Sequence, residues 1–401
     1  LSSSSRRMRG KRKLSSDSPV VKMQLVEVDG ILDWEETTGA MPDLGMFRGA
    51  VSSDEQSIEL TFDRLPPSKV TQFLEGRDLS LTPPRGIRRY DPLARDLVEA
   101  SFPNDGEALV FVHGTFSNGE NILSGLLETP DGIVFLAKAV ERYKGNVFTF
   151  DHPTLAVGPI LNAFDLQRQF GESTARVNLV SHSRGGLVAR WWCETFDPLG
   201  DRCHKAVLVG SPLAGTGLAA PPNIRRTIHL LTQVSRALQV SAGLTSLAIP
   251  VFSIVETLLR VVTSITGFAA KAPIADAAMA MVPGLFSMSR VGNNPELTRL
   301  FETPSRPDRY YAIKSNFETS DPAWKFWRLF RATRLADHAT DVLFDGANDL
   351  VVDTESMTQL ADGLRIDAAR TLDFGTSDSV HHLNYFSQPR TVEFLAETLL
   401  E

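Results

Sequence analysis

One stretch limits the folds open to this chain more than any other, the run from Val177 to Arg190, VNLVSHSRGGLVAR. Its first residues are aliphatic and β-branched, as in a buried strand, and its last residues repeat apolar positions as a helix does. Ser183 lies between the two parts, with Ser181 before it and Gly185 and Gly186 after it. Small neighbours let a strand and a helix pass closely on either side of a strained turn, which pushes the central side chain outward. The run therefore predicts a strand, a sharp turn that presents the Ser183 hydroxyl, and a helix.

The backbone of the same turn offers a second chemical group. The N–H of Arg184 would lie at the N-terminus of the helix, where the helix dipole stabilises negative charge. A backbone N–H in that position can hydrogen-bond the oxyanion that forms when a serine attacks a carbonyl group. One turn would then supply a nucleophile and half of an oxyanion hole.

This pattern resembles the nucleophile elbow of the α/β-hydrolase family, Gly-x-Ser-x-Gly, and its lipase form Gly-His-Ser-x-Gly-Gly. Ser181 stands where the family usually has Gly, so the departure is toward another small residue. The resemblance implies an α/β fold with a mostly parallel central sheet flanked by helices and with a helical cap or lid insertion. A structural serine in an ordinary strand-to-helix turn is the alternative, and the rest of the chain has to decide between them.

Length and composition narrow the class of protein. The 401 residues can bury one large core or two smaller ones, and the formal net charge of −7 argues against nucleic acid as the main partner. Two cysteines cannot build a disulfide framework, so we expect Cys193 and Cys203 to be buried free thiols, with a bridge between them as the alternative. No signal peptide is visible, which indicates a cytoplasmic protein, although the chain begins with Leu1 and its true N-terminus can be missing.

Three regions follow from the distribution of residues along the chain. Residues 1–20 are rich in Ser, Lys and Arg without apolar periodicity, so we expect a disordered basic tail that is solvated rather than bound to nucleic acid or lipid. Residues 21–102 alternate as strands at Met23–Val28 and Ser57–Phe62, which predicts an N-terminal extension with the first, antiparallel strands. Residues 103–401 would form the α/β-hydrolase domain.

Strands and helices alternate around Ser183, which predicts a parallel sheet wound by right-handed crossovers. Ala108–Phe116 is a nearly continuous apolar strand, as expected for a strand buried on both faces. The other expected strands cover 146–150, 204–212, 309–314 and 370–374, and the expected helices cover 121–143, 161–174 and 185–196. Ligands bind at the carboxyl ends of such strands, where His113, Asp151 and Ser183 fall.

The loop after the strand 108–116 resembles the His-Gly loop of lipases, in which the backbone N–H after the Gly completes the oxyanion hole. By that resemblance the donor is Thr115, with Phe116 as the neighbouring candidate. His113 would brace the loop rather than take part in the reaction. A second segment, Gly210–Thr216, resembles the Gly-Thr-Pro-His-x-Gly-Ser segment that lipases carry after the next strand of the sheet.

The segment from about residue 218 to residue 300 interrupts the alternation of strands and helices. Ile224–Val240 has the spacing of an amphipathic helix, and Leu244–Phe268 is apolar almost all round. Pro250 should break the second run, and together with Glu256 and Arg260 it argues against a membrane-spanning helix. The resemblance implies a cap or lid here, which would line an apolar acyl pocket and could touch a membrane surface. Extra core helices are the alternative.

A serine nucleophile needs a base beside it, and the base needs a carboxylate to orient it. In α/β-hydrolases the order along the chain is Ser, acid, His. The segment around Asp349 resembles the Asn-Asp-Gly-x-Val segment that carries the acid in lipases, so we choose Asp349; Asp345 is second, and Asp353 is expected at the surface. For the base we favour His382, because lipases open a similar segment with His, and His381 remains the alternative.

These features predict a serine ester hydrolase, a lipase or esterase, with GPI inositol-deacylase-like lipases as a possible relative. The catalytic residues would be Ser183, Asp349 and His382, and Thr115 and Arg184 would form the oxyanion hole. The expected partner is an acyl ester or lipid substrate, and no cofactor, no metal site and no nucleic acid are expected. Two alternatives stay open: an amidase or peptidase with the same residues, and a non-catalytic hydrolase-fold module for binding or effector recruitment.

Overall fold

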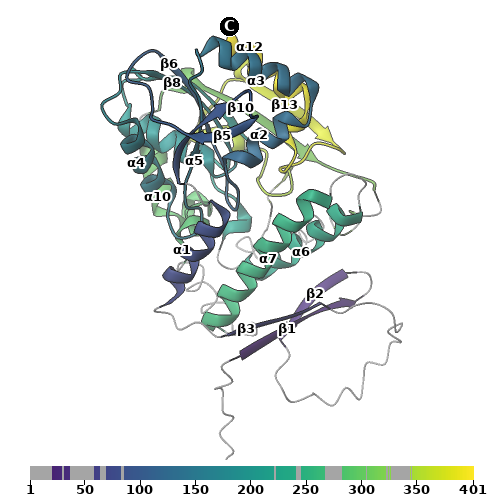
Figure 1. Cartoon of the computed structure of the whole chain (residues 1–401). Helices are drawn as coiled ribbons and strands as arrows, with labels where there is room; N and C mark the ends of the chain where they lie inside the picture. The colour runs from purple at the N-terminus through teal and green to yellow at the C-terminus, as the bar shows by residue number, and fades with distance from the viewer. Residues whose placement is uncertain are drawn as a thin grey trace, which may run out of the picture.

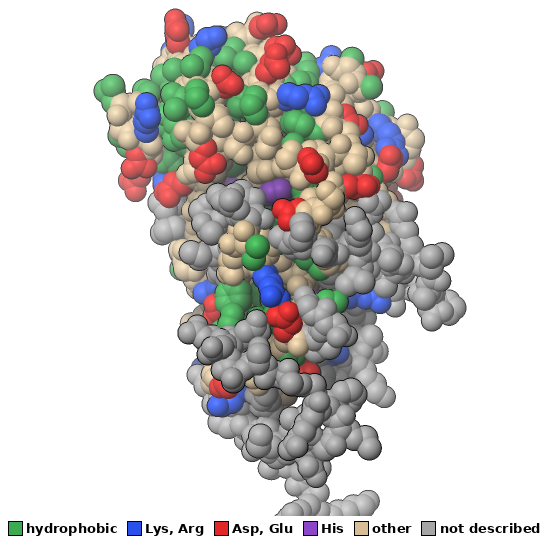
Figure 2. Space-filling model, turned by 90° about the vertical axis from the view of Figure 1, so that its right-hand side faces the viewer, with side chains coloured by type: hydrophobic (Ala, Val, Ile, Leu, Met, Phe, Trp, Pro, Cys, Tyr) green, Lys and Arg blue, Asp and Glu red, His purple; other side chains and the backbone are tan. Residues whose placement is uncertain are grey.

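The computed structural model describes residues 20–28, 31–36, 58–63, 69–82, 85–220, 223–240, 245–266, 282–303, 305–321, 324, 326, 344 and 346–401. Two predictions lie outside these residues: the basic tail, up to residue 19, and Asp345, the second candidate for the acid. Figure 2 shows one face of the molecule, on which Lys and Arg are interspersed with Asp and Glu and a histidine reaches the surface at one place.

The centre of the molecule is an eight-stranded sheet with the strand order β13-β10-β9-β8-β6-β7-β4-β5. Neighbouring strands from β13 to β7 are parallel, whereas β4 is antiparallel to β7 and β5 is antiparallel to β4. The strands are β4 (Gly86–Asp91), β5 (Asp96–Glu99), β6 (Glu107–Val112), β7 (Val147–Asp151), β8 (Arg176–His182), β9 (Cys203–Val209), β10 (Tyr310–Phe317) and β13 (Thr371–Ser377). The predicted mostly parallel sheet is confirmed. A small hairpin, β11 (Gln359–Ala361) with β12 (Leu364–Arg365), lies outside it.

Helices cover both faces of this sheet (Figure 1), because successive side chains of its strands point to opposite faces and both sets are apolar. On strand β6, Leu109 and Phe111 belong to one core and Val110 and Val112 to the other. The helices of the first core are α2 (Gly119–Leu127), α3 (Pro130–Arg142) and α12 (Pro389–Leu400), and those of the second are α4 (Pro159–Phe170), α5 (Gly185–Trp191) and α10 (Pro295–Glu302).

Two predicted helices differ from those observed. The stretch 121–143 forms the two helices α2 and α3, because Thr129 accepts the N–H of Gly132 as an N-cap and Pro130 starts a new helix. The helix expected over 185–196 is α-helical only to Trp191 and continues as a π-helix over Trp192–Phe196. Cys193 in this π-helix and Cys203 are buried and unbridged, as expected, with their sulfur atoms 3.0 Å apart.

The predicted N-terminal strands form a sheet of their own rather than the first strands of the central sheet. β1 (Val20–Val28) pairs with β2 (Ile31–Glu36) and β3 (Glu59–Asp63), all antiparallel, and helix α1 (Val70–Leu81) follows. Alternation of polar and apolar residues suits such a sheet, which has one face toward water. The antiparallel strands of the central sheet are β4 and β5, which the sequence patterns did not indicate.

The segment 218–300 supplies helices α6 (Ile224–Val240) and α7 (Thr245–Thr266), here called the cap helices, and the short helix α9 (Pro283–Phe286). Helix α7 runs through Pro250 without a break, contrary to prediction. Pro250 is the sixth residue of the helix, so the clash of its ring falls on the carbonyl of residue 246, in the first turn, and most of the helix follows it undisturbed. None of the helices in the described ranges is long and apolar enough to cross a membrane.

The N-terminal sheet packs against the cap helices, below the central sheet in Figure 1. The indole N–H of Trp34 donates to the Thr232 hydroxyl at 3.0 Å, and the Gln233 amide donates to a backbone carbonyl of β2 at 2.6 Å. Arg236 pairs with Glu27 at 3.1 Å. Strands at the N-terminus therefore hold the outer side of α6.

Candidate active site

The turn between β8 and α5 has the strained geometry that the sequence predicts. Ser183 has a φ of +53°, a conformation that residues other than Gly rarely adopt. Its N–H donates to the carbonyl of Val209 at 2.9 Å. A Cβ on Gly185 would lie 2.3 Å from the Val112 carbonyl oxygen, and one on Gly186 would lie 2.1 Å from a serine hydroxyl of the next loop. Both glycines are thus required by close packing.

Asp349 and His382 form a buried pair at the carboxyl end of the sheet. His382 Nδ1 lies 2.9 Å from Asp349 Oδ2, and the His382 N–H donates to the carbonyl of Asp349, also at 2.9 Å. The second carboxylate oxygen accepts the N–H groups of Val351 and Val352 at 3.1 and 2.9 Å. The carboxylate is therefore fixed by its own loop, and it fixes the imidazole in turn.

His381, the alternative base, and Asp353 have other partners than this pair. His381 packs its ring against Phe317 and Trp324, and its Nδ1 accepts a backbone N–H. Burial lowers the pKa of His381 to about 4. Asp353, expected at the surface, is buried and pairs with Arg290 at 3.2 Å, so that expectation was wrong. Of the two histidines, His382 is the one whose ring nitrogen contacts Asp349.

His182, the residue before Ser183, lies against the base rather than the nucleophile. Its Nε2 is 2.9 Å from the carbonyl oxygen of His382, and the two rings are 4.8 Å apart at their centroids. Burial lowers the pKa of His182 to about 3, so the ring is neutral at physiological pH and Nε2 can donate to this carbonyl. His182 therefore supports the backbone of the segment that carries His382.

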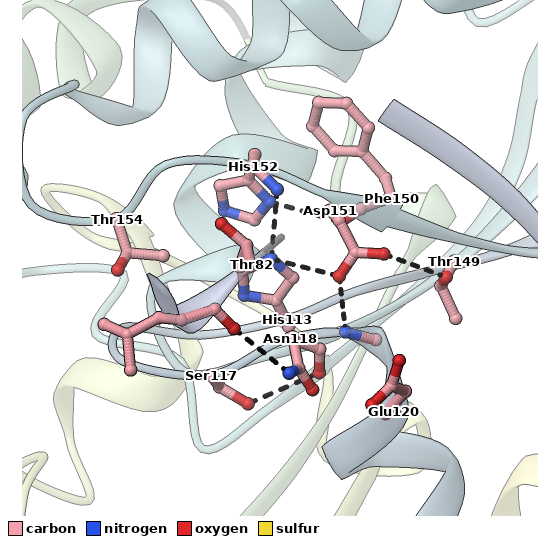
Figure 3. A network of polar contacts seen from close by, with 12 residues as sticks. Thr82, His113, Ser117, Asn118, Glu120, Thr149, Phe150, Asp151, His152 and Thr154 are labelled. Atoms are coloured by element: carbon pink, nitrogen blue, oxygen red, sulfur yellow. Dashed lines mark hydrogen bonds and ion pairs between the residues drawn. The ribbon is translucent and has the colours of Figure 1, made fainter. Parts of the chain in front are cut away.

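A polar network supports the loop 113–119 after β6 (Figure 3). At Gly114 this loop lies against Ser183. His113 Nε2 accepts the N–H of His152 at 3.1 Å, and the two rings stack with centroids 4.1 Å apart. Asp151 accepts the N–H of Gly119 at 2.7 Å and pairs with Arg88 at 2.8 Å. Burial lowers the pKa of His113 to about 4, which agrees with a neutral bracing residue.

The backbone N–H groups of Thr115 and Arg184, the two predicted oxyanion donors, have no hydrogen-bond partner among the described residues. The loop lies so close that a Cβ on Gly114 would be 2.7 Å from the Ser183 Cβ. Phe116, the other candidate donor, gives its N–H to the Thr154 hydroxyl at 3.1 Å. A backbone N–H that is not paired internally is available to a ligand.

The side chain of Arg184 does not face the nucleophile. It is fully buried, and its guanidinium donates to the carbonyls of Gly284 and Val157. Burial lowers the Arg184 pKa to about 10. The residue thus ties the start of α5 to helix α9 while its backbone N–H stays unpaired.

Ser183 and His382 line one cavity of about 120 Å³, far more than the ~15 Å³ that one water needs. The cap helices supply much of its wall, and no side chain that lines it is charged. The lining residues are Thr115, Phe116, Ser183, Pro212, Thr216, Leu218, Ala219, Ile224, Thr227, Leu231, Val234, Val251, Ile254, Leu258, Leu285, Met288, Leu350, Val351, Val352, His382 and Leu383. Within the described ranges, no cluster of His, Cys, Asp and Glu is arranged to hold a metal ion.

Comparison with protein families decides where this chain belongs. Residues 82–400 match the model of a domain of unknown function, DUF7379. The chain is a member of this family. No curated protein sequence matches it.

The DUF7379 chain is also similar to solved structures of lipases and esterases. It is 18% identical to lipase BlEst2 from Bacillus licheniformis in its mature form, covering 76% of this chain and 96% of that one with a TM-score of 0.38. Lipase 1 from Pelosinus fermentans is 14% identical, with 74% and 99% covered and a TM-score of 0.42. A thermophilic esterase from Thermogutta terrifontis is 14% identical, with 79% and 98% covered and a TM-score of 0.37. The predicted fold class, a mostly parallel sheet flanked by helices, rests on the strand order and pairing of this structure itself.

Sequence reasoning missed three residues that support the candidate site of this DUF7379 member. The Tyr385 hydroxyl donates to Asp349 at 2.9 Å. Thr154 accepts the N–H of Phe116, and Asp78 accepts the N–H of Thr154. Tyr385 could have been found, since it follows His382 by three residues, close to one turn of a helix. Asp78 carries no local signal, because its partners lie more than seventy residues along the chain.

Proposed function

We propose that this protein is a serine hydrolase that cleaves carboxylic esters with apolar acyl groups through an acyl-enzyme. The observation that carries the proposal is the buried Asp349–His382 pair, 2.9 Å between Oδ2 and Nδ1, which opens on the same cavity as Ser183. Nucleophile, base and orienting carboxylate are the three groups that such catalysis needs.

The first half of the reaction forms the acyl-enzyme. Ser183 Oγ attacks the ester carbonyl while His382 Nε2 takes the hydroxyl proton. Asp349 holds the imidazole with its Nδ1 proton toward the carboxylate and stabilises the imidazolium. The oxyanion accepts hydrogen bonds from the N–H groups of Thr115 and Arg184, each worth roughly 3 kcal/mol of transition-state stabilisation. Collapse of the adduct expels the alcohol, which takes its proton from His382.

The second half regenerates the enzyme. Water gives a proton to His382 Nε2 and attacks the acyl carbon, and the same two N–H groups hold the new oxyanion. The adduct then breaks at the bond to Ser183 Oγ, which recovers its proton from His382. The carboxylic acid leaves, and no cofactor takes part.

The cavity supports an apolar acyl group. Its wall includes Leu231 and Val234 of α6 and Ile254 and Leu258 of α7. A hydrocarbon chain that is buried against such side chains stabilises the complex by about 0.8 kcal/mol for each of its CH₂ groups. A charged acyl chain would lose hydration there without gaining a counter-charge. We therefore propose a lipid or another apolar ester as the substrate.

The test is hydrolysis of p-nitrophenyl esters from acetate to palmitate. We expect the wild type to be active, Ser183→Ala and His382→Ala to lose about 10³-fold or more in kcat, and His381→Ala to keep most of it. A fluorophosphonate probe should label the wild type at Ser183 and should not label Ser183→Ala. Parallel assays with p-nitroanilides test the amidase alternative.

A wild-type protein that hydrolyses none of these esters and resists the probe would overturn the proposal. That result would favour the alternative of a non-catalytic hydrolase-fold module. Equal loss in His381→Ala and His382→Ala, with both variants folded, would overturn the assignment of the base alone.

A further inference from the structure

The backbone of Phe116 is held in an unusual conformation by a contact from outside its own loop. Phe116 has a φ of +56°, a conformation that a bulky L-residue adopts only when its surroundings impose it. Its N–H donates to Thr154 Oγ1 at 3.1 Å, and Thr154 belongs to the loop after β7. Thr115 directly precedes Phe116, so the bond from the Phe116 N–H holds the peptide on the C-terminal side of Thr115, whose own N–H is unpaired among the described residues.

The Thr154 hydroxyl is in turn held by a buried carboxylate, Asp78 of helix α1. Asp78 Oδ1 accepts this hydroxyl at 3.3 Å and the Thr154 N–H at 2.7 Å. The same carboxylate accepts the N–H groups of Leu155 at 3.0 Å and Ala156 at 2.8 Å. All partners of Asp78 in these contacts are donors, as an ionised carboxylate requires.

This arrangement fixes the direction of the hydrogen bonds. A threonine hydroxyl has one hydrogen, which Thr154 donates to Asp78 in a hydrogen bond. The lone pairs of Thr154 Oγ1 therefore remain to accept the N–H of Phe116. Hydrogen bonds to a charged acceptor are the stronger ones, and Asp78 is only 1% exposed, so water competes little for it. Phe116 therefore donates to Thr154 and Thr154 donates to Asp78, and the reverse direction is not possible.

We propose that Thr154, oriented by Asp78, is a positioning residue for the oxyanion site. It engages the Phe116 N–H and thereby leaves the Thr115 N–H directed at the oxyanion above Ser183. This inference rests on the proposed function and adds to it a part of the chain that precedes the family domain. Asp78 lies before residue 82, where the match to DUF7379 begins, so helix α1 contributes to a site built otherwise from that domain.

The test compares Thr154→Val, which keeps the shape and removes the hydroxyl, with Thr154→Ser, which keeps the hydroxyl. The assay uses the full chain and the p-nitrophenyl ester that the wild type hydrolyses best. We expect Thr154→Val to lose ~10- to 100-fold in kcat with KM within about twofold, because an oxyanion donor acts in the transition state. Thr154→Ser should recover most of that loss.

A second readout separates positioning from general damage. An alkyl trifluoromethyl ketone adds to a catalytic serine and forms a stable oxyanion, so its inhibition constant reports on the oxyanion site. We expect that constant to rise in Thr154→Val by about the factor by which kcat/KM falls. The matched control is Thr391→Val in helix α12, which removes a buried threonine hydroxyl that has no hydrogen-bond partner within the described ranges. It should change neither value.

Asp78→Asn is the second variant. An amide keeps one acceptor oxygen but places an NH₂ donor where the second carboxylate oxygen accepts the N–H groups of Leu155 and Ala156. The variant therefore loses one acceptor and the negative charge, and kcat should fall at least as far as in Thr154→Val. The melting temperature of each variant is measured alongside.

The outcomes separate the two proposals. A folded Thr154→Val with wild-type kcat and wild-type inhibition by the ketone overturns the role of Thr154 and leaves the proposed function intact. Equal losses in Thr154→Val and Thr154→Ser, with matching falls in melting temperature, also overturn it, since packing alone would then explain them. A wild type without esterase activity and without probe labelling overturns the proposed function, and this inference with it.

Discussion

The Tyr385 hydroxyl donates a hydrogen bond to Asp349 Oδ2 over 2.9 Å, the same distance and the same oxygen that His382 Nδ1 uses. With the two backbone N–H groups on Oδ1, the carboxylate receives four hydrogen bonds, and Asp349 is fully buried. Burial and the charge of Asp349 raise the pKa of Tyr385 well above its ordinary value, so the phenol keeps its proton. Tyr385 therefore withdraws part of the negative charge that Asp349 offers to His382.

Tyr385→Phe should therefore change the pH dependence of catalysis as well as the rate. Without the phenol, Asp349 stabilises the His382 imidazolium more strongly, so we expect the acidic limb of the kcat/KM profile to move to higher pH. The lost bond to a buried charge should also lower the free energy of unfolding by about 2 kcal/mol. Stopped assays from pH 4.5 to 9 and urea unfolding measure the two effects. An unchanged acidic limb in a folded variant would contradict the first expectation.

Gly210→Ala should damage the same cluster from the opposite side. Gly210 has a φ of +54°, and an added Cβ would lie 2.7 Å from a ring carbon of Tyr385 and 3.2 Å from Asp349 Oδ2. Strain and overpacking together should destabilise the protein by about 3 kcal/mol, with kcat reduced at least tenfold. Gly145→Ala is the control, because its φ is +85° and no atom lies within 4 Å of the added Cβ. The control should lose stability alone; equal activity in both variants would count against the packing argument.

The parts of this structure that could be predicted are those with local signals. The turn at Ser183 is visible because strand, small residues and helix follow one another within fourteen positions. The break between α2 and α3 also has a local signal, an N-cap at Thr129 followed by Pro130, which the apolar periodicity outweighed. The fold class follows from many such signals in order, so a single wrong boundary does not change it.

The parts that could not be predicted depend on contacts between distant segments. Nothing near Asp78 indicates that its carboxylate will meet residues 154–156, and nothing near Trp34 indicates a bond to Thr232 of α6. The choice between His381 and His382 is of the same kind, since either could follow β13 and only the packing against Asp349 separates them. Burial of Asp353 was missed because its partner, Arg290, lies 63 positions away.

Four histidines predict a loss of stability in mild acid. Burial lowers the pKa of His113 and His381 to about 4, that of His182 to about 3 and that of His152 well below its ordinary value, whereas unfolded histidine titrates near 6.5. Because the folded pKa is the lower one, the unfolded state binds more protons as the pH falls below 6.5. The free energy of unfolding should therefore fall as the pH is lowered from 6.5 to about 4. Above pH 6.5 these histidines should add no pH dependence.

Urea unfolding at half-unit steps from pH 7.5 to 4 measures this slope. His381→Asn removes one of the four groups and keeps a side-chain oxygen that can accept the N–H of Leu383. Its slope should be less steep than that of the wild type by up to ~1.4 kcal/mol per pH unit. Identical slopes for the two proteins would show that His381 titrates in the folded state as it does in the unfolded chain.

The cap helices should set the length of the acyl chain that the cavity accepts. Val234 of α6 is buried and lines the cavity, so Val234→Phe fills space that a long acyl chain would use. We expect the rate on p-nitrophenyl palmitate to fall about tenfold or more relative to acetate, since each excluded methylene is worth about 1–3 kcal/mol. Val240→Phe at the end of the same helix is the control, because Val240 is 67% exposed. Equal losses on acetate and palmitate in Val234→Phe would place the acyl chain elsewhere.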